Sequence, residues 1–235
     1  MVEATPISCA LTLRRGLLLL LTTVAMQLPG CANVSHPHSA FEALPAHTAQ
    51  AVVVTVAPGQ PLRACVAAFE QSDDGWRAAL PTMRAVVGLR GIVPGDRKRE
   101  GDGGTPSGMH RVGLAFGYEA QLATGLEYRQ ATAADWWIDD PLSPSYNRWV
   151  TSKPQVSAEA MRRDDDQYEV GCVLEWNTQA PVPGRGSAIF FHVWKNPETP
   201  TSGCVAVSET DARALLAWLD RSRSPVFVVC EPRDE

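Results

Sequence analysis

The sequence predicts one mostly-β (α+β) domain with one clear helix near its C-terminus. Short runs rich in β-branched and aromatic residues recur between turns that contain proline and glycine, a pattern typical of strands. Apolar residues at helical spacing, behind a capping residue, stand out in a single segment near the C-terminus. The chain has 235 residues, which suffices for one sizeable core or two small ones.

The first thirty residues have the pattern of an export signal. Two arginines precede the apolar run GLLLLLTTVAM, and small residues follow it. The stretch Leu28-Pro29-Gly30-Cys31 also resembles a bacterial lipobox, in which the chain is cut before the cysteine and lipid is attached to its sulfur. We therefore expect a signal peptide over 1–30 and an exported protein of the periplasm or cell envelope, lipid-anchored at Cys31. Cleavage after Ala32, giving a soluble secreted protein, is the alternative.

The next segment, 31–50, is polar, contains proline and lacks a sustained period, so it reads as a tether. Its three histidines are expected to be solvated, and we predict no metal site. A formal net charge of -5 without a basic run argues against a nucleic-acid partner. The folded domain is expected over 51–235.

Strands are expected in AVVVTVA (51–57), PLRACVAAFE (61–70), MRAVVGLRGIV (83–93), YEVGCVLEWNT (168–178), SAIFFHVW (187–194) and PVFVV (225–229). The glycine-rich loop over 95–108 lacks the GK[ST] ending of a phosphate-binding loop. We interpret WWIDDPLSPSYNRWV (136–150) as a long structured loop and RRDDDQ (162–167) as a solvated turn. The helix is predicted in SETDARALLAWLDRS, with Ser208 and Asp211 as a capping-box-like start.

One histidine and one cysteine flank a proline-rich loop in the C-terminal third of the chain. His192 is expected near the end of its strand, and Cys204 follows Gly203. A free thiol is mostly protonated near neutral pH, and a neighbouring imidazole can take its proton so that the thiolate attacks an acyl carbon. Glycine permits close backbone approach and lets amide hydrogens face an oxyanion. The structural alternative is two disulfides in an oxidising compartment, formed by Cys65, Cys172, Cys204 and Cys230.

A family resemblance lies in the segment HVWKNPETPTSGCVAVSETDARALLAWLD, which is similar to the active-site segment of the YkuD-type L,D-transpeptidases. In these bacterial cell-wall enzymes a strand histidine precedes [Ser/Thr]-x-Gly-Cys, which here reads Thr201-Ser202-Gly203-Cys204. A second patch, GDGGTPSGMHRV, resembles the family's Thr-Pro-x-Gly turn. The match suggests the branch with Thr-x-Gly-Cys-Val-Ala and implies a single β-sandwich-type catalytic domain over 51–235.

The resemblance implies cysteine acyl transfer on peptidoglycan stem peptides, without a cofactor. It makes Cys204 the nucleophile, His192 the general base and acid, and Gly203 part of the oxyanion-hole region. Thr201 and Ser202 then fall in the substrate-binding segment.

Three features depart from the family's common form. Ser202 replaces a histidine, and Ala206 stands where an arginine helps to bind the donor peptide. The gap from histidine to cysteine is also shorter. We expect another cation, Arg111 or Arg148, to take the place of the missing arginine.

Three alternatives stay open. With water as acceptor, the same chemistry makes a carboxypeptidase or amidase. A papain-like or NlpC-type peptidase fits less well, because there the cysteine precedes the histidine. A non-catalytic, envelope-binding lipoprotein would hold Cys204 in a disulfide.

Overall fold

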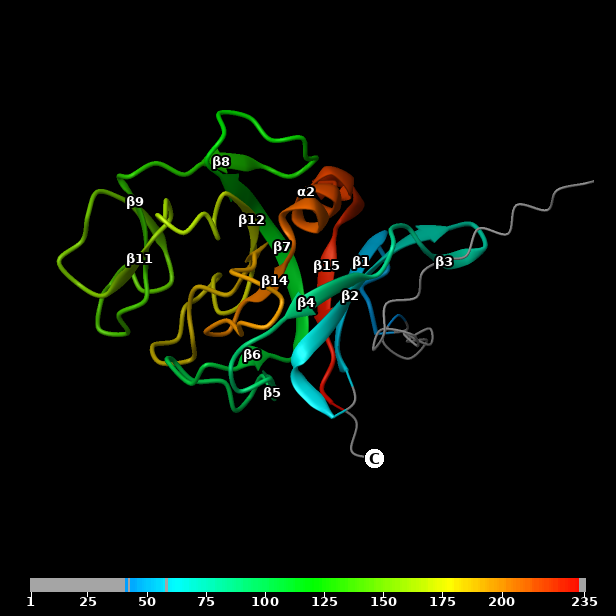
Figure 1. Ribbon diagram of the computed structural model, residues 1–235, viewed down its shortest axis with the longest axis horizontal. Coiled ribbons are helices and arrows are strands. Elements are labelled where there is room, and N and C mark those ends of the chain that lie inside the picture. Colours follow the sequence, from blue (N-terminus) through cyan, green and yellow to red (C-terminus); the bar gives the residue numbers. More distant parts are fainter. Residues whose placement is uncertain (1–40, 42, 58, 233–235) are drawn as a thin grey trace, which may run out of the picture.

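The computed structural model describes residues 41, 43–57 and 59–232 (Figure 1). The predicted signal peptide over 1–30 and the lipid anchor at Cys31 lie outside these residues, as does most of the predicted tether. Within the described part, no helix is long and apolar enough to cross a membrane.

Ten strands form one sheet that closes on itself (Figure 1). They are β1 (Gln50–Ala57), β2 (Gln60–Ser72), β3 (Gly75–Ala78), β4 (Met83–Val86), β7 (Gly108–Gly117), β8 (Tyr128–Gln130), β12 (Val170–Leu174), β13 (Phe190–Val193), β14 (Val205–Val207) and β15 (Val226–Val229). The order is β1-β15-β7-β12-β13-β14-β4-β2-β3, with β8 beside β7, and β1 also pairs with β2. The mostly-β prediction is confirmed. The pairings describe one continuous ring of strands, and the sandwich detail stays a prediction.

The inner core lies on the face of this sheet that packs against the helix α2 (Glu209–Trp218). Ser208 caps the helix by accepting a hydrogen bond from the Asp211 N–H at 3.1 Å, as the capping box predicts. The strand expected over 168–178 is observed as β12, and both of its faces are buried. Its side chains that enter the inner core are Val170, Cys172 and Leu174.

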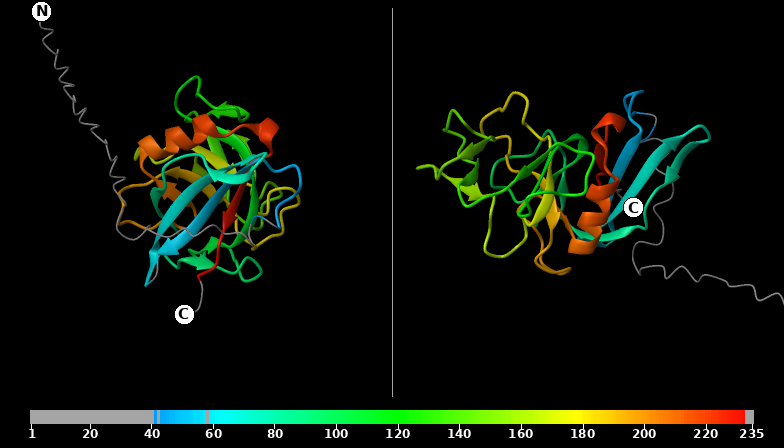
Figure 2. Two further views of the ribbon diagram at one scale, coloured as in Figure 1. Left: turned by 90° about the vertical axis from the view of Figure 1, so that its right-hand side faces the viewer. Right: turned by 90° about the horizontal axis from the view of Figure 1, so that it is seen from above.

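The prediction that 136–150 is a loop is wrong in part. This segment contributes most of β9 (Asp135–Ile138) and β10 (Trp149–Thr151), which pair with each other. With β11 (Ala158–Ala160) they form a three-stranded sheet, called here the cap sheet. Tryptophan and valine at the two ends of the segment favour strands, and the proline-containing stretch between them makes the turn. The cap sheet stands to one side of the main sheet (Figures 1 and 2).

The expected strand over 83–93 is divided by a turn. After β4, Gly91 N–H donates to Gly88 O at 2.7 Å, and Gly91 has a φ of +71°. Such a conformation suits glycine, so the turn interrupts an otherwise apolar run. The remainder forms the short β5 (Ile92–Val93), parallel to β6 (Thr105–Pro106).

The folded part extends into the predicted tether over 31–50. Gln50 opens β1, and its side chain is buried between two main-chain groups near the end of α2: its amide donates to Trp218 O at 2.7 Å, and its carbonyl accepts from Asp220 N at 2.8 Å. Phe41 stacks on Trp76 with ring centroids 4.9 Å apart.

Candidate active site

The predicted nucleophile lies between the main sheet and the cap sheet. The face of the main sheet opposite the inner core is called here the outer face, and it packs against aromatic and apolar residues of the cap. The cluster comprises Phe116, Ala131, Trp137, Met161, Tyr168, Val173, Ala188, Phe190 and Cys204. Cys204 is 6% exposed, so its thiol is almost completely removed from water.

The strand register places His192 and Cys204 on the same face. β13 runs parallel to β14, with Phe191 opposite Val205 and His192 opposite Ala206. Because side chains alternate along a strand, Phe190, His192 and the residue just before β14, Cys204, all project from the outer face. The structure therefore brings the two predicted catalytic residues together as diagonal neighbours.

The thiol points to the backbone ahead of β13 and makes its hydrogen bonds there. Its Sγ–H donates to Ala188 O at 3.3 Å, and the sulfur accepts from the Phe190 N–H at 3.3 Å. Burial raises the pKa of Cys204 to about 12, and the Glu159 carboxylate adds to this effect. The resting thiol is therefore protonated.

His192 lies one residue before the end of β13, as expected, and is 3% exposed. It is buried because β13 is paired on both sides, with β12 and β14, and the Tyr168 ring packs against the imidazole, with centroids 5.1 Å apart. Burial lowers the pKa of His192 to about 4, so the ring is neutral. Its Nδ1 lies 2.7 Å from Val193 O, an acceptor, which assigns the proton to Nδ1 and leaves the Nε2 lone pair as the basic site.

The predicted motif Thr201-Ser202-Gly203-Cys204 forms a hydrogen-bonded turn. The Thr201 hydroxyl accepts from the Gly203 N–H at 3.1 Å and donates to Cys204 O at 2.7 Å. Gly203 has a φ of +147°, which requires glycine. Ser202 is exposed. These contacts make Thr201 a support of the nucleophile, and the substrate-binding roles of Thr201 and Ser202 stay predictions.

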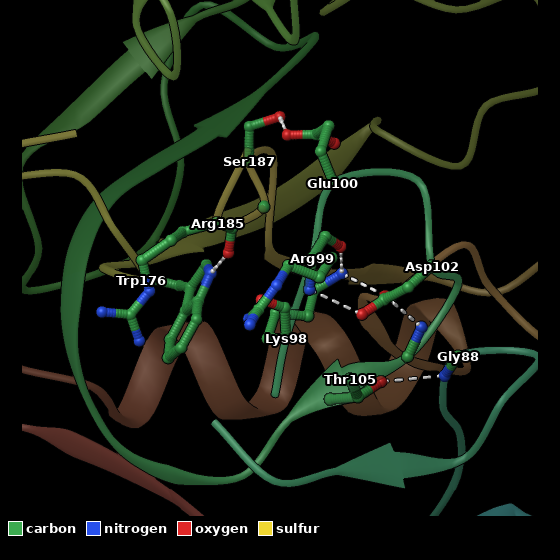
Figure 3. Close-up of polar contacts among 12 residues, drawn as sticks. Gly88, Lys98, Arg99, Glu100, Asp102, Thr105, Trp176, Arg185 and Ser187 are labelled. Carbon is green, nitrogen blue, oxygen red and sulfur yellow. Dashed lines mark hydrogen bonds and ion pairs between the residues drawn. The ribbon is translucent and has the colours of Figure 1, made fainter. Parts of the chain in front are cut away.

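The glycine-rich loop over 95–108 is hydrogen-bonded to this turn. The buried Thr105 hydroxyl accepts from the Gly88 N–H at 2.8 Å (Figure 3) and donates to Cys204 O at 3.3 Å. Ahead of it, Asp102 accepts from Lys98 Nζ at 2.5 Å and from the Gly104 N–H at 2.8 Å. The Gly104 carbonyl lies 3.0 Å from where a Cβ on Gly203 would sit. Any side chain at Gly203 would therefore displace the loop.

Tyr168 joins the site to two charged residues, one in the cap sheet and one in the loop that follows it. Its hydroxyl donates to Glu159 Oε2 at 2.5 Å, and the guanidinium of Arg163 lies over its ring, 5.0 Å from the centroid. Burial raises the pKa of Glu159. Sequence reasoning missed these residues and treated Arg163 as part of a solvated turn. The only indication in the sequence was that the charge run 162–167 directly precedes the strand expected over 168–178.

The two arginines predicted to recognise the donor occupy different surroundings. The Arg148 guanidinium donates to the carbonyls of Thr178 and Gln179, which ties it to the following loop. Arg111 is an exposed residue of β7, opposite Val226 of β15. Their roles in donor binding stay predictions.

The cysteines of the described part differ in state. Cys172 and Cys204 are free thiols, whereas Cys65 on β2 is disulfide-bonded. A free Cys204 is what a nucleophile requires, and it removes the basis for the alternative in which Cys204 is bridged. Among the described residues, no group of three or more His, Cys, Asp or Glu side chains is placed to hold a metal ion.

A buried cysteine and a neutral histidine lie on adjacent strands, with a glycine turn before the cysteine, as the sequence predicts for a thiol nucleophile and its base. The comparison with protein families agrees: the model of the YkuD L,D-transpeptidase catalytic domain matches residues 72–228, more than half of the chain. The chain belongs to this family of L,D-transpeptidase-type enzymes. No curated protein and no solved structure matches it significantly.

Proposed function

We propose that the protein is a cell-wall L,D-transpeptidase that acylates Cys204 with a peptidoglycan stem peptide. The observation that carries the proposal is the placement of a free Cys204 beside a His192 whose Nδ1 is anchored on Val193 O, within a matched YkuD domain. Anchoring Nδ1 keeps Nε2 available for the proton of the nucleophile.

In the acylation step, the Cys204 proton passes to His192 Nε2 as the sulfur attacks the carbonyl of the L-centre before the terminal D-residue. The tetrahedral intermediate collapses when His192 returns the proton to the leaving amine. The C–N bond breaks, the D-residue leaves, and a thioester remains. The Gly203 N–H already donates to Thr201, so we assign Gly203 the shaping of the turn and the neighbouring Cys204 amide the stabilisation of the oxyanion.

The acyl group then passes from the Cys204 sulfur to an acceptor. If the acceptor is an amine of another stem peptide, a cross-link forms; if it is water, the thioester is hydrolysed and the protein is a carboxypeptidase. The apolar surroundings of Cys204, which include Trp137, Met161 and Phe190, favour the amine because they exclude water from the thioester. Transfer is thus the proposed reaction, and hydrolysis is the competing outcome.

The test is intact mass after incubation with a carbapenem, whose strained β-lactam carbonyl is an acyl donor to a thiolate. We expect one covalent adduct on the wild type, none on Cys204→Ala, and an unchanged adduct on Cys172→Ala. Cys172 is the matched control because it is a free, buried thiol on the inner-core face. An adduct that persists in Cys204→Ala would contradict the proposed nucleophile. A stem peptide with and without an amine acceptor then separates transfer from hydrolysis.

We also propose that the protein is exported and carries lipid on Cys31. The export pattern of the first thirty residues supports export, as does the disulfide at Cys65, because structural disulfides persist in oxidising compartments. The lipobox-like stretch that ends at Cys31 supports the lipid anchor. Metabolic labelling with a fatty acid should mark the wild type and not Cys31→Ser. Non-reducing peptide mapping provides the second readout, since a Cys31–Cys65 bridge would exclude lipidation of that sulfur.

A further inference from the structure

The strands that carry the reactive pair supply no positive charge beside it. Ala206, opposite His192 in the register, presents only a methyl group. The buried Lys98 donates to Asp102, and the Arg148 guanidinium donates to loop carbonyls. A cation that meets the substrate at this face must therefore come from another segment.

Arg163 reaches the site from the loop after the cap sheet. Its guanidinium lies 5.0 Å from the centroid of the Tyr168 ring, and the same ring contacts His192 at 5.1 Å. Beside the dominant effect of burial, the Arg163 charge also lowers the pKa of both His192 and Cys204, as expected for a cation close to both. The Arg163 side chain is 35% exposed, so a substrate can reach it from solvent.

The Arg163 guanidinium has more hydrogen-bond donors than its contact with Asp165 uses. Arg163 Nε and Nη2 donate to the two oxygens of Asp165 at 2.8 and 2.6 Å, which uses one edge of the group. A guanidinium carries five N–H donors, and its other edge is formed by Nη1 and the second Nη2 hydrogen. Among the described residues, no side chain or carbonyl accepts a hydrogen bond from Nη1. This edge matches the two oxygens of a second carboxylate.

We propose that the free edge of Arg163 binds the terminal carboxylate of the D-residue that leaves the donor stem peptide, which makes Arg163 a specificity-determining residue. The inference rests on the proposed function, because that reaction places a carboxylate one residue beyond the attacked carbonyl. Asp165 orients the guanidinium, and the Tyr168 ring holds it beside His192. A bidentate ion pair between Arg163 and this carboxylate selects donor peptides that end in a D-residue with a free carboxylate.

The test compares two donors, a stem-type peptide that ends in a D-residue with a free carboxylate and the same peptide with a C-terminal carboxamide. Release of the terminal residue is measured for the wild type and for Arg163→Gln, Arg163→Lys and Arg162→Gln. For Arg163→Gln we expect at least a tenfold loss of kcat/KM on the acid donor, mainly through KM, and a change within about twofold on the amide donor. Arg163→Lys keeps the positive charge but lacks the paired N–H groups of the guanidinium, so it should retain part of the preference for the acid donor.

Arg162→Gln is the matched control. Arg162 is the neighbouring exposed arginine and also lies over a tyrosine, Tyr118, at 4.6 Å, but that ring makes no contact with His192. The Arg162→Gln variant should leave the ratio of kcat/KM on the acid donor to kcat/KM on the amide donor unchanged. If release of the terminal residue depends on Cys204 but the acid-to-amide ratio of kcat/KM is the same in Arg163→Gln and the wild type, the role of Arg163 is refuted and the proposed function stands. If neither donor is cleaved in a Cys204-dependent manner, the proposed function fails and the inference fails with it.

Discussion

At the residue scale, burial keeps both reactive groups neutral in the free protein. The pKa of Cys204 is raised to about 12 and that of His192 is lowered to about 4, so a preformed thiolate–imidazolium pair is disfavoured. In the proposed reaction, proton transfer must therefore accompany attack on the substrate, with His192 as the general base. Closure of the site around the substrate would also strengthen each electrostatic contact inside it.

We predict from this that Cys204 reacts slowly with iodoacetamide in the free enzyme. Raising the thiol pKa from 9.0 to about 12 leaves ~10³-fold less thiolate near neutral pH. The alkylation rate, followed at this cysteine by peptide mapping, should therefore be about a thousandfold lower than in the urea-unfolded chain. Below pH 10 it should rise tenfold for each pH unit. A plateau near pH 7 would instead show a stabilised thiolate.

Thr105 gives a second prediction at this scale. Thr105→Val keeps the shape of the side chain but removes the hydroxyl that bridges the Gly88 N–H and Cys204 O. An unsatisfied buried N–H costs roughly 1–3 kcal/mol, so urea denaturation should show a loss of that size. The carbapenem acylation rate should fall as well, because the Cys204 turn loses one of its two hydroxyl contacts. Thr105→Ser, which keeps the hydroxyl, should restore most of both.

At the element scale, one asparagine joins the turn of the cap sheet to the segment that leads into β13, the strand of His192. Asn147 is buried, and its carbonyl accepts from Trp137 Nε1 at 2.9 Å and from the Ala188 N–H at 3.1 Å. Its amide donates to the carbonyls of Trp176 and Asn177. Ala188, which accepts from the Cys204 thiol, has a φ of +52° and is held in this conformation by its neighbours.

Asn147→Leu should therefore destabilise the protein and disturb the nucleophile together. The variant leaves several buried polar groups without partners, and it places a branched side chain at a φ of +56°, which asparagine tolerates better. We expect a loss of roughly 3 kcal/mol or more in urea unfolding, with a lower carbapenem acylation rate in the folded fraction. The exposed Asn196 is the control, since Asn196→Leu should cost less than about 1 kcal/mol. Equal effects at the two positions would contradict the bridging role.

The sequence could predict those parts of the site that depend on local patterns. The motif predicted that His192 and Cys204 lie close together, and the strand register places them on one face as diagonal neighbours. Their catalytic roles stay predictions. The contributions of Tyr168, Arg163 and Asn147 depend on contacts between segments that are distant along the chain, so no local period indicates them. A charge run such as 162–167 is usually solvated, and only the fold shows that one of its arginines lies over an aromatic ring of the site.

At the scale of the whole molecule, the buried histidines link folding stability to acid pH. An unfolded histidine titrates near 6.5, whereas the folded pKa of His192 is about 4, so below pH 6.5 the unfolded chain binds a proton that the folded protein does not. The contribution of His192 is therefore present above pH 6.5 and is lost as the pH falls toward 4. Burial also lowers the pKa of His110, which acts in the same direction.

His192→Gln should flatten this acid dependence, because glutamine is polar, similar in size and does not titrate. Urea denaturation at pH 7.0 and at pH 4.5 gives the stability lost by each protein between the two conditions. We expect the wild type to lose about 2 kcal/mol more than the variant, while His110 and the carboxylates contribute equally to both and cancel in the difference. An equal loss in the two proteins would mean that His192 takes up its proton in the folded state near its ordinary pKa. The depressed pKa of the buried His192 would then have to be abandoned.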